Sequence, residues 1–320
     1  LVQAPFDFVS LLVRAGILDQ KNDAAAGEAY GRALAQRPAD ALPAMLHRAV
    51  ERAEIVYQEH QQALEMTLQK AAQGLHDSLA PVEQGRAERF ISNISRRTRI
   101  FHSEPTHFHY PHLLECEFHE RAEFPWLDDW EAATDLIEAE LATLLEAESA
   151  ELVPYVQYSM SEPLSQWRDL NHSLKWTSIH LLQRGQLVES NARHCPQTMA
   201  LLSRFPQPRI AGCGANAMFS LLAPNTQIPP HVGVANFRLV CHLPLRVPEK
   251  CWFRVGETVR EWRRGEAWVF DDTIEHEAAN GSDELRVIMI IDCWHPDLSP
   301  AEQSAIAAIV GESSIRETDL

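Results

Sequence analysis

The sequence predicts an α+β chain in which a small helical domain precedes a larger domain of β-strands. Apolar side chains recur at helical spacing over about the first 70 residues. From about residue 151 the chain consists of short segments that are rich in β-branched and aromatic residues and are separated by turns. We therefore expect a helical domain over residues 1–100 and a β domain over residues 101–320.

The helical periodicity is clearest over residues 41–68. The apolar positions there are Ala41, Met45, Leu46, Val50, Ile55, Leu64 and Leu68. The preceding segment, AAAGEAYGRALAQRPAD, resembles the closing part of a tetratricopeptide repeat. Only one partial copy is present, whereas a stable array normally needs about three repeats. A domain of repeat-like helix pairs and a plain helical bundle both fit this pattern.

A connector with the proline and aromatic content of a loop follows, FHSEPTHFHYPH (101–112). It contains four histidines, His102, His107, His109 and His112. Because no helical or strand spacing fixes these side chains around a metal, we interpret the segment as a loop. One further helix is expected in LDDWEAATDLIEAELATLLEAE, since the acidic residues that open it favour a helix N-terminus.

The second domain contains seven segments with the composition of strands. They are YVQYS, WTSIHLLQRG, RIAGCGANAMFSLLAP, ANFRLVCHLPLRV, CWFRVGETVREW, AWVFDD and LRVIMIIDCWH. Turn-forming sequences such as Asn280-Gly281-Ser282-Asp283 separate them. At least seven strands in about 145 residues, with no long helix between them, indicate a β-sandwich or a double-sheet jelly roll. The segment SPAEQSAIAAIVGE then predicts a closing helix.

Composition and charge narrow the classes of function. Apolar residues make up 45% and charged residues 23%, as in globular proteins. The net charge of −17 argues against broad binding to nucleic acid or anionic lipid, because both attract basic surfaces. No apolar run approaches the roughly 18–20 residues that span a bilayer, and the N-terminus lacks the basic start of a signal peptide. The six cysteines form no CxxC pair. We expect a cytoplasmic protein with reduced thiols and no membrane or nucleic-acid partner.

Polar side chains interrupt or border several of the apolar strands. They are Ser220, His231, His242, His276 and Arg286. His231 and His276 lie 45 residues apart, which is enough for about three strands and their turns, so both can reach one point inside a jelly roll. Arg286 follows His276 by ten residues and would lie one strand further on. This spacing is compatible with one interior site.

These residue types suit a metal together with a small dicarboxylate. Two neutral imidazoles suit Fe(II) and leave most coordination positions open. The fork of Arg286 fits a carboxylate bidentately, and Ser220 can donate a second hydrogen bond to it. A dicarboxylate such as 2-oxoglutarate would satisfy both ends of such a site. Structural interpretations stay open, because backbone groups often satisfy a buried histidine and Arg286 could form an ion pair with Asp272 or Asp292.

Two long segments carry a resemblance to a known family. FSLLAPNTQIPPHVGVANFRLVCHLPL and GEAWVFDDTIEHEAANGSDELRVIMIIDCWHPDLS resemble the aspartyl/asparaginyl β-hydroxylases, which are Fe(II)- and 2-oxoglutarate-dependent oxygenases. The motifs PPHVG, FDDTIEHE and DCWHP occur in order, and weaker similarity extends the resemblance to about residues 108–305. The resemblance implies a double-stranded β-helix, which is a cupin-like jelly roll, and some members carry a tetratricopeptide-like domain before it.

The resemblance also implies roles for the site residues. His231 and His276 match the two metal-binding histidines of the family. Arg286 and Ser220 match the residues that hold the distal carboxylate of 2-oxoglutarate. His242 matches a histidine near the metal-proximal carboxylate of the same cosubstrate.

Four further positions complete the comparison with the family. Asp272 matches an acidic catalytic residue that hydrogen-bonds a water on the metal rather than binding iron. Gly233 stands where non-haem iron oxygenases usually have a carboxylate ligand, and this family lacks that ligand. Arg238 matches the first of two arginines and is expected to bind cosubstrate, whereas Val240 replaces the second. Residues two apart on a strand share a face, so Val240 would face the site. The missing guanidinium would remove a strong partner for an acidic substrate or for the cosubstrate.

We therefore expect a dioxygenase that uses Fe(II), 2-oxoglutarate and O2, hydroxylates an unactivated C–H bond and releases succinate and CO2. The expected substrate is a peptidyl Asp or Asn or another small polar molecule, and the helical domain is a candidate docking site for a protein partner. Three alternatives stay open: a non-catalytic metal-binding jelly roll, a helical-repeat interaction protein, and an iron halogenase.

Overall fold

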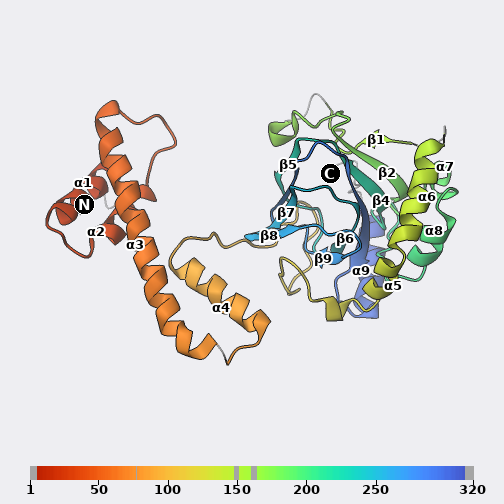
Figure 1. The fold of residues 1–320 in the computed structure, drawn as a ribbon, viewed down its shortest axis with the longest axis horizontal. Coiled ribbons are helices and arrows are strands. Elements are labelled where there is room, and N and C mark those ends of the chain that lie inside the picture. Colours follow the sequence, from red (N-terminus) through yellow and green to blue (C-terminus); the bar gives the residue numbers. More distant parts are fainter. Residues whose placement is uncertain (1–5, 77, 148–150, 160–163, 314–320) are drawn as a thin grey trace. The chain divides into compact units, whose positions relative to one another are not determined.

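A computed structural model describes residues 6–76, 78–147, 151–159 and 164–313 of the chain. The chain divides into two compact units, Leu1–Ile100 and Phe101–Leu320. The described part of the first unit is helical, and all strands of the described chain belong to the second (Figure 1).

The described part of the first unit contains four helices, α1 (Phe8–Gln20), α2 (Ala26–Leu34), α3 (Ala44–His76) and α4 (Pro81–Ile94). Asp7 caps α1 by accepting a hydrogen bond from the backbone N–H of Ser10 at 2.7 Å. The apolar stripes of α1, α2 and α3 bury a common core of Phe8, Leu11, Leu12, Ala15, Tyr30, Ala33, Val50 and Ala53. The prediction of a helical N-terminal region is confirmed, whereas its tetratricopeptide character stays a prediction.

Two glycines of α2 allow that helix to approach α3 closely. A Cβ atom at Gly27 would collide with the side chain of His60, and one at Gly31 would collide with the ring of Tyr57. The small residues in AAAGEAYGRALAQRPAD therefore serve helix packing within this unit.

The strands of the second unit form two antiparallel sheets. Their bounds are β1 (Val153–Pro154), β2 (Trp176–Gln183), β3 (Gln186–Leu187), β4 (Ala217–Leu222), β5 (Thr226–His231), β6 (Arg238–Arg246), β7 (Cys251–Val255), β8 (Thr258–Glu261), β9 (Trp268–Phe270), β10 (His276–Asn280) and β11 (Arg286–Trp294). The larger sheet has the order β1-β2-β4-β11-β6-β9, with β3 paired to β2, and the smaller sheet has the order β5-β10-β7-β8. From β4 to β7 and from β9 to β11, consecutive strands alternate between the sheets. This alternation is that of a double-stranded β-helix, so the predicted fold class is confirmed.

Helices of the second unit cover the outer face of the larger sheet (Figure 1). They are α5 (Leu127–Ala132), α6 (Thr134–Glu146), α7 (Glu189–Ala192) and α8 (Pro196–Leu202), and α9 (Pro300–Glu312) follows the last strand. Short 3-10 turns occur at Arg121–Glu123 and Ser165–Trp167.

The single helix predicted from LDDWEAATDLIEAELATLLEAE is wrong, because the structure divides this segment into α5 and α6. At the junction the Thr134 hydroxyl donates to the carbonyl of Glu131 at 2.6 Å, and the N–H of Ala133 donates to Trp130 three residues back. Such local bonds replace the regular helical ladder. The final residue of the predicted helix, Glu148, lies outside the described residues.

The predicted strand YVQYS is also different in the structure, which has β1 at Val153–Pro154 and an isolated bridge between Val156 and Asn171. The side chain of Asn171 accepts from the N–H of Tyr158 at 2.8 Å and donates to its carbonyl at 3.1 Å. A side-chain amide thus satisfies backbone groups that a neighbouring strand would otherwise pair.

Strand alternation separates the two cores of this unit. On β11, Val287, Met289 and Ile291 pack towards the helices, whereas Ile288 and Ile290 belong to the core between the sheets. The same period of two holds on β4 and β6. Residues in register with Ile288 and Ile290 therefore face the space between the two sheets.

Candidate metal and cosubstrate site

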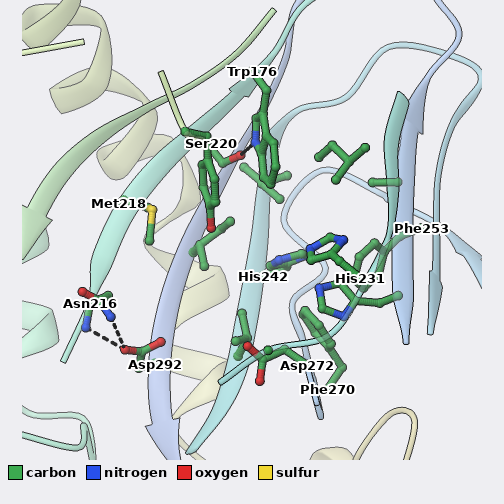
Figure 2. Close-up of a pocket in the computed structure, with 18 of the residues that line it drawn as sticks. Trp176, Asn216, Met218, Ser220, His231, His242, Phe253, Phe270, Asp272 and Asp292 are labelled. Atoms are coloured by element: carbon green, nitrogen blue, oxygen red, sulfur yellow. Dashed lines mark hydrogen bonds between the residues drawn. The ribbon is translucent and has the colours of Figure 1, made fainter. Parts of the chain in front are cut away.

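A cavity of about 220 Å³ lies between the two sheets. All seven site residues predicted from the sequence line it, namely Ser220, His231, Arg238, His242, Asp272, His276 and Arg286. Figure 2 shows four of them, Ser220, His231, His242 and Asp272, which come from strands of both sheets and from the loop before β10. The fold thus brings together residues that are up to 66 positions apart in the sequence.

The two histidines of the smaller sheet face each other across a strand pair. His231 ends β5 and His276 begins β10, and the two residues are direct partners in the antiparallel register. Their ring centroids are 4.0 Å apart. Antiparallel pairing therefore places two imidazoles side by side although 45 residues separate them in the sequence.

Backbone carbonyls fix the protonation of both rings. Nδ1 of His231 lies 2.7 Å from the carbonyl oxygen of Pro229, and Nδ1 of His276 lies 3.1 Å from that of Ile274. A carbonyl only accepts, so each Nδ1 carries the proton and donates it. The lone pair of each ring is then on Nε2, the arrangement that a metal-binding histidine requires.

Burial keeps these rings neutral. It lowers the pKa of His276 to about 4, and burial together with the neighbouring His276 holds the pKa of His231 well below its usual value. Neutral imidazole is the form that binds a metal.

At the end of the cavity formed by β4 and β11, Arg286 is a buried cation without a counter-charge. Its residue is 1% exposed, and neither its Nε nor its Nη1 has a hydrogen-bond partner among the described residues. The guanidinium carbon lies 5.0 Å from the ring centroid of Trp262, a cation–π contact that does not neutralise the charge. Burial lowers the pKa of Arg286 to about 10, so the group stays charged at neutral pH. A buried cation with free donors is a strong indication of an anionic ligand.

Ser220 supports the same end of the cavity. It lies on β4, and its cross-strand partner Ile288 is two residues from Arg286 on β11. Trp176 Nε1 donates to the Ser220 oxygen at 3.0 Å, which leaves the hydroxyl proton of Ser220 available for a ligand.

His242 lies on β6, within an aromatic enclosure. Its ring centroid is 4.7 Å from that of Phe270 and 5.0 Å from that of Phe253. Burial, Arg286 and His276 hold its pKa well below the usual value, so the ring is neutral. Its Nδ1 is buried without a partner among the described residues. A free polar atom in this enclosure points to a further contact with a bound group.

Arg238 lies in a cluster of buried charges. Its guanidinium is 3.2 Å from a carboxylate oxygen of Asp272 and 3.2 Å from one of Asp292. Asn216 donates to Asp292 from its backbone N–H at 2.7 Å and from its side chain at 3.0 Å. The structural ion pair considered for Arg286 is therefore wrong, because both carboxylates pair with Arg238 instead.

The sequence patterns do not place Trp176, Asn216 or Trp262 in the site, and they suggest Asp292 only as an ion-pair partner. One signal was available for Asp292, because residues 286, 288, 290 and 292 alternate onto one face of β11. Trp262 lies in a loop, and Arg286 lies on a strand 24 positions later. A local sequence pattern therefore does not predict the contact between them.

Acidification is expected to destabilise the metal-free protein. Six histidines that are buried or half-buried have a pKa below the usual value, mainly because of desolvation: His119, His180, His231, His242, His276 and His295. As pH falls below about 6.5, these histidines become protonated in the unfolded chain but stay neutral in the folded chain. The free energy of unfolding therefore falls progressively towards about pH 4, where the folded chain also binds protons at His180 and His276. The carboxyls of Asp271, Asp272 and Asp292 act in the opposite direction, because burial raises their pKa, in the case of Asp271 to about 7. The urea midpoint in the presence of chelator should be lower at pH 5.0 than at pH 7.5; an unchanged or higher midpoint contradicts this prediction.

The sequence of the β domain matches a known protein family. The family model for aspartyl/asparaginyl β-hydroxylase matches residues 131–296, just over half of the chain. The chain belongs to this family. The match contains every site residue described above and ends just after the DCWH sequence of β11.

Three relatives show how far the similarity extends. The human aspartyl/asparaginyl β-hydroxylase is 35% identical over 136 residues, 42% of this chain and 18% of that protein. Aspartate β-hydroxylase domain-containing protein 2 of Xenopus tropicalis is 34% identical over 179 residues, 55% of this chain and 48% of that protein. The ornithine lipid ester-linked acyl 2-hydroxylase of Rhizobium tropici is 34% identical over 215 residues, 65% of this chain and 72% of that protein. The chain thus matches less than a fifth of the human β-hydroxylase but most of the Rhizobium enzyme.

Solved structures with a similar fold include cupin domains. The Schizosaccharomyces pombe Cnp3 cupin domain matches this chain with a TM-score of 0.26 and 8% sequence identity. The match covers 38% of this chain and 66% of the Cnp3 chain. A cupin 2 conserved barrel domain protein from Salinispora arenicola matches with a TM-score of 0.23 and 11% sequence identity. This match covers 31% of the present chain and 75% of the Salinispora chain. The fold assignment itself rests on the strand pairing.

Among the described residues, no cluster of three or more His, Cys, Asp or Glu side chains has the geometry of a metal site. No helix in this part of the chain is both long and apolar enough to cross a bilayer.

Proposed function

We propose that the β domain is an Fe(II)- and 2-oxoglutarate-dependent dioxygenase that hydroxylates an unactivated C–H bond. One observation carries the proposal: an unpaired buried guanidinium, Arg286, lines the same cavity as two histidines with free Nε2 atoms. A cavity with a cation at one end and two neutral nitrogen donors elsewhere suits a metal together with an anion.

The residues present fit Fe(II). His231 and His276 would hold it through Nε2, while the two carbonyl contacts keep the rings oriented. Two protein ligands leave most coordination positions for cosubstrate and dioxygen. Gly233 fits the same arrangement, because it supplies no third ligand.

The residues present also fit 2-oxoglutarate. Arg286 would pair with the distal carboxylate and Ser220 would donate to it, which would satisfy donors that are otherwise unused. His242 faces the same cavity and would contact the carboxylate nearer the metal. The burial of Arg286 supports a tight and specific contact, since solvent does not screen it.

When bound, the iron and cosubstrate supply the oxidising chemistry, in which 2-oxoglutarate and O2 yield succinate, CO2 and the hydroxylated product. The chain's own residues orient these groups and exclude water. Phe253 and Phe270 pack around His242 and His276, which makes this part of the cavity apolar. An apolar enclosure protects reactive groups from side reactions with solvent.

Two substrate classes follow from the relatives. A peptidyl Asp or Asn, or another small polar group, corresponds to the name of the human relative. An acyl chain corresponds to the name of the Rhizobium relative, and the apolar side chains of Met218, Val240 and Ile290 on the cavity wall favour it as the second candidate.

Reconstitution under argon provides the test. The purified chain is loaded with Fe(II), supplied with 2-oxoglutarate and air, and assayed for succinate with Asp- and Asn-containing peptides and with ornithine-lipid vesicles. We expect succinate formation that requires iron and rises with one substrate class. Failure to bind 2-oxoglutarate in the presence of iron, or turnover that does not require iron, contradicts the proposed function.

A further inference from the structure

Asp272 occupies the space where a third protein ligand would otherwise lie. A Cβ atom built on Gly233 would collide with the Asp272 carboxylate. The N–H of Gly233 donates to the backbone carbonyl of Asp272 at 2.6 Å, so the two segments are fastened together at this point. In the usual two-histidine, one-carboxylate set, the ligand comes from the position that Gly233 holds here. The carboxylate of Asp272 therefore lies where it could itself approach the metal.

Asp272 is also close to one of the metal-binding histidines. His276 follows Asp272 by four residues, and both side chains line the cavity. One carboxylate oxygen of Asp272, Oδ1, is buried without a hydrogen-bond partner among the described residues, while Oδ2 faces Arg238 at 3.2 Å. A buried carboxylate oxygen with a free lone pair next to a metal position is a potential ligand.

Arg238 is fixed from its other side. Asp292 accepts from it at 3.2 Å, and Asn216 donates twice to Asp292. Figure 2 shows Asn216 and Asp292 at the end of the cavity away from Ser220 and Trp176. The side chains of Arg238, Asp272 and Asp292 are 12%, 10% and 4% exposed, so water does not weaken these pairs as it would on the surface.

We propose that Arg238, anchored by Asp292, is a positioning residue that holds the Asp272 carboxylate beside the metal but outside its coordination sphere. This inference rests on the proposed function, because it takes His231 and His276 as the metal ligands. It assigns Arg238 a role different from the cosubstrate binding expected from the sequence. The open coordination position of the site then depends on an ion pair as well as on the missing side chain at Gly233.

A charge-neutral double replacement tests the proposal. In Arg238→Met/Asp292→Asn one cation and one anion disappear together, so the net charge of the three groups stays at −1 and Asp272 is released. Mn(II) replaces Fe(II) as the probe, and its affinity for the metal-free full chain is measured by EPR without cosubstrate. We expect Mn(II) to bind about tenfold more tightly, on the scale of effects seen when groups next to a metal are changed. With Mn(II) bound, 2-oxoglutarate should bind more weakly, because Asp272 occupies a position that it needs.

Two further variants decide how an altered affinity is interpreted. Adding Asp272→Asn to the double replacement should remove the gain, because the neutral amide lacks the negative charge that attracts Mn(II). Glu140→Gln is the matched control, since Glu140 is a buried carboxylate that accepts from Thr198 on the helix-covered side of the sheet. This control is expected to leave Mn(II) affinity unchanged.

The possible outcomes are distinct. An unchanged or weaker Mn(II) affinity in the folded double variant, or a gain that persists with Asp272→Asn, overturns the positioning role. If the double variant does not fold, Arg238→Lys gives the same information: it keeps the charge but not the two-sided fork, and it should also bind Mn(II) more tightly. Absence of Mn(II) binding by the unmodified chain would instead contradict the proposed metal site.

Discussion

Replacement of His231 or His276 by alanine is expected to abolish both Fe(II) binding and succinate formation. The two imidazoles lie side by side and are the proposed metal ligands, and each supplies a single Nε2 lone pair. Loss of either leaves one protein ligand, which is too few to retain Fe(II) against water. Metal content after reconstitution and gel filtration measures the first effect, and succinate formed from 2-oxoglutarate measures the second.

His119→Gln is the control for this experiment. His119 is a buried histidine outside the cavity, and its ring lies 5.1 Å from that of His295. Its replacement is expected to lower stability without changing the iron content. Iron retention by the doubly substituted His231→Ala/His276→Ala chain would show that the metal binds elsewhere.

Side chains alternate between the two faces of each strand, and this alternation explains why the sequence predicts many of the residues that line the cavity. Polar residues stand out against apolar strands, and a period of two predicts which of them face inward. Ser220 and Arg286 are typical examples, because each is surrounded by apolar neighbours along its strand. The facing of His231 and His276 also follows from antiparallel pairing once the fold class is known.

Other features depend on contacts that a local pattern does not specify. The sequence leaves the partners of Arg238 undefined, because Asp272 is in a loop and Asp292 is 54 residues away on another strand. The collision that a side chain at Gly233 would produce likewise requires the position of the loop before β10. The break between α5 and α6 depends on hydrogen bonds at Thr134 that helical periodicity alone does not reveal.

Arg286→Met is expected to weaken 2-oxoglutarate binding on the order of 100-fold while leaving metal affinity nearly unchanged. A bidentate charge-assisted contact contributes about 3 kcal/mol, which corresponds to this loss. The same replacement should raise the melting temperature of the ligand-free chain. It removes a buried cation that has no counter-charge and puts an apolar side chain of similar length in contact with Trp262.

These opposite signs distinguish a ligand-binding arginine from a structural one. Thermal melts with and without 2-oxoglutarate, in the presence of Mn(II), measure both effects, because cosubstrate at about 100 times its Kd stabilises the unmodified chain by about 2.7 kcal/mol. That stabilisation should vanish in Arg286→Met and return in part in Arg286→Lys, which restores the charge without the fork. A structural arginine would give a different result: Arg286→Met would lower the melting temperature, and metal and cosubstrate affinity would fall together. The unpaired donors of Arg286 favour the first outcome, since a cation that stabilised the fold would have its partner within the protein.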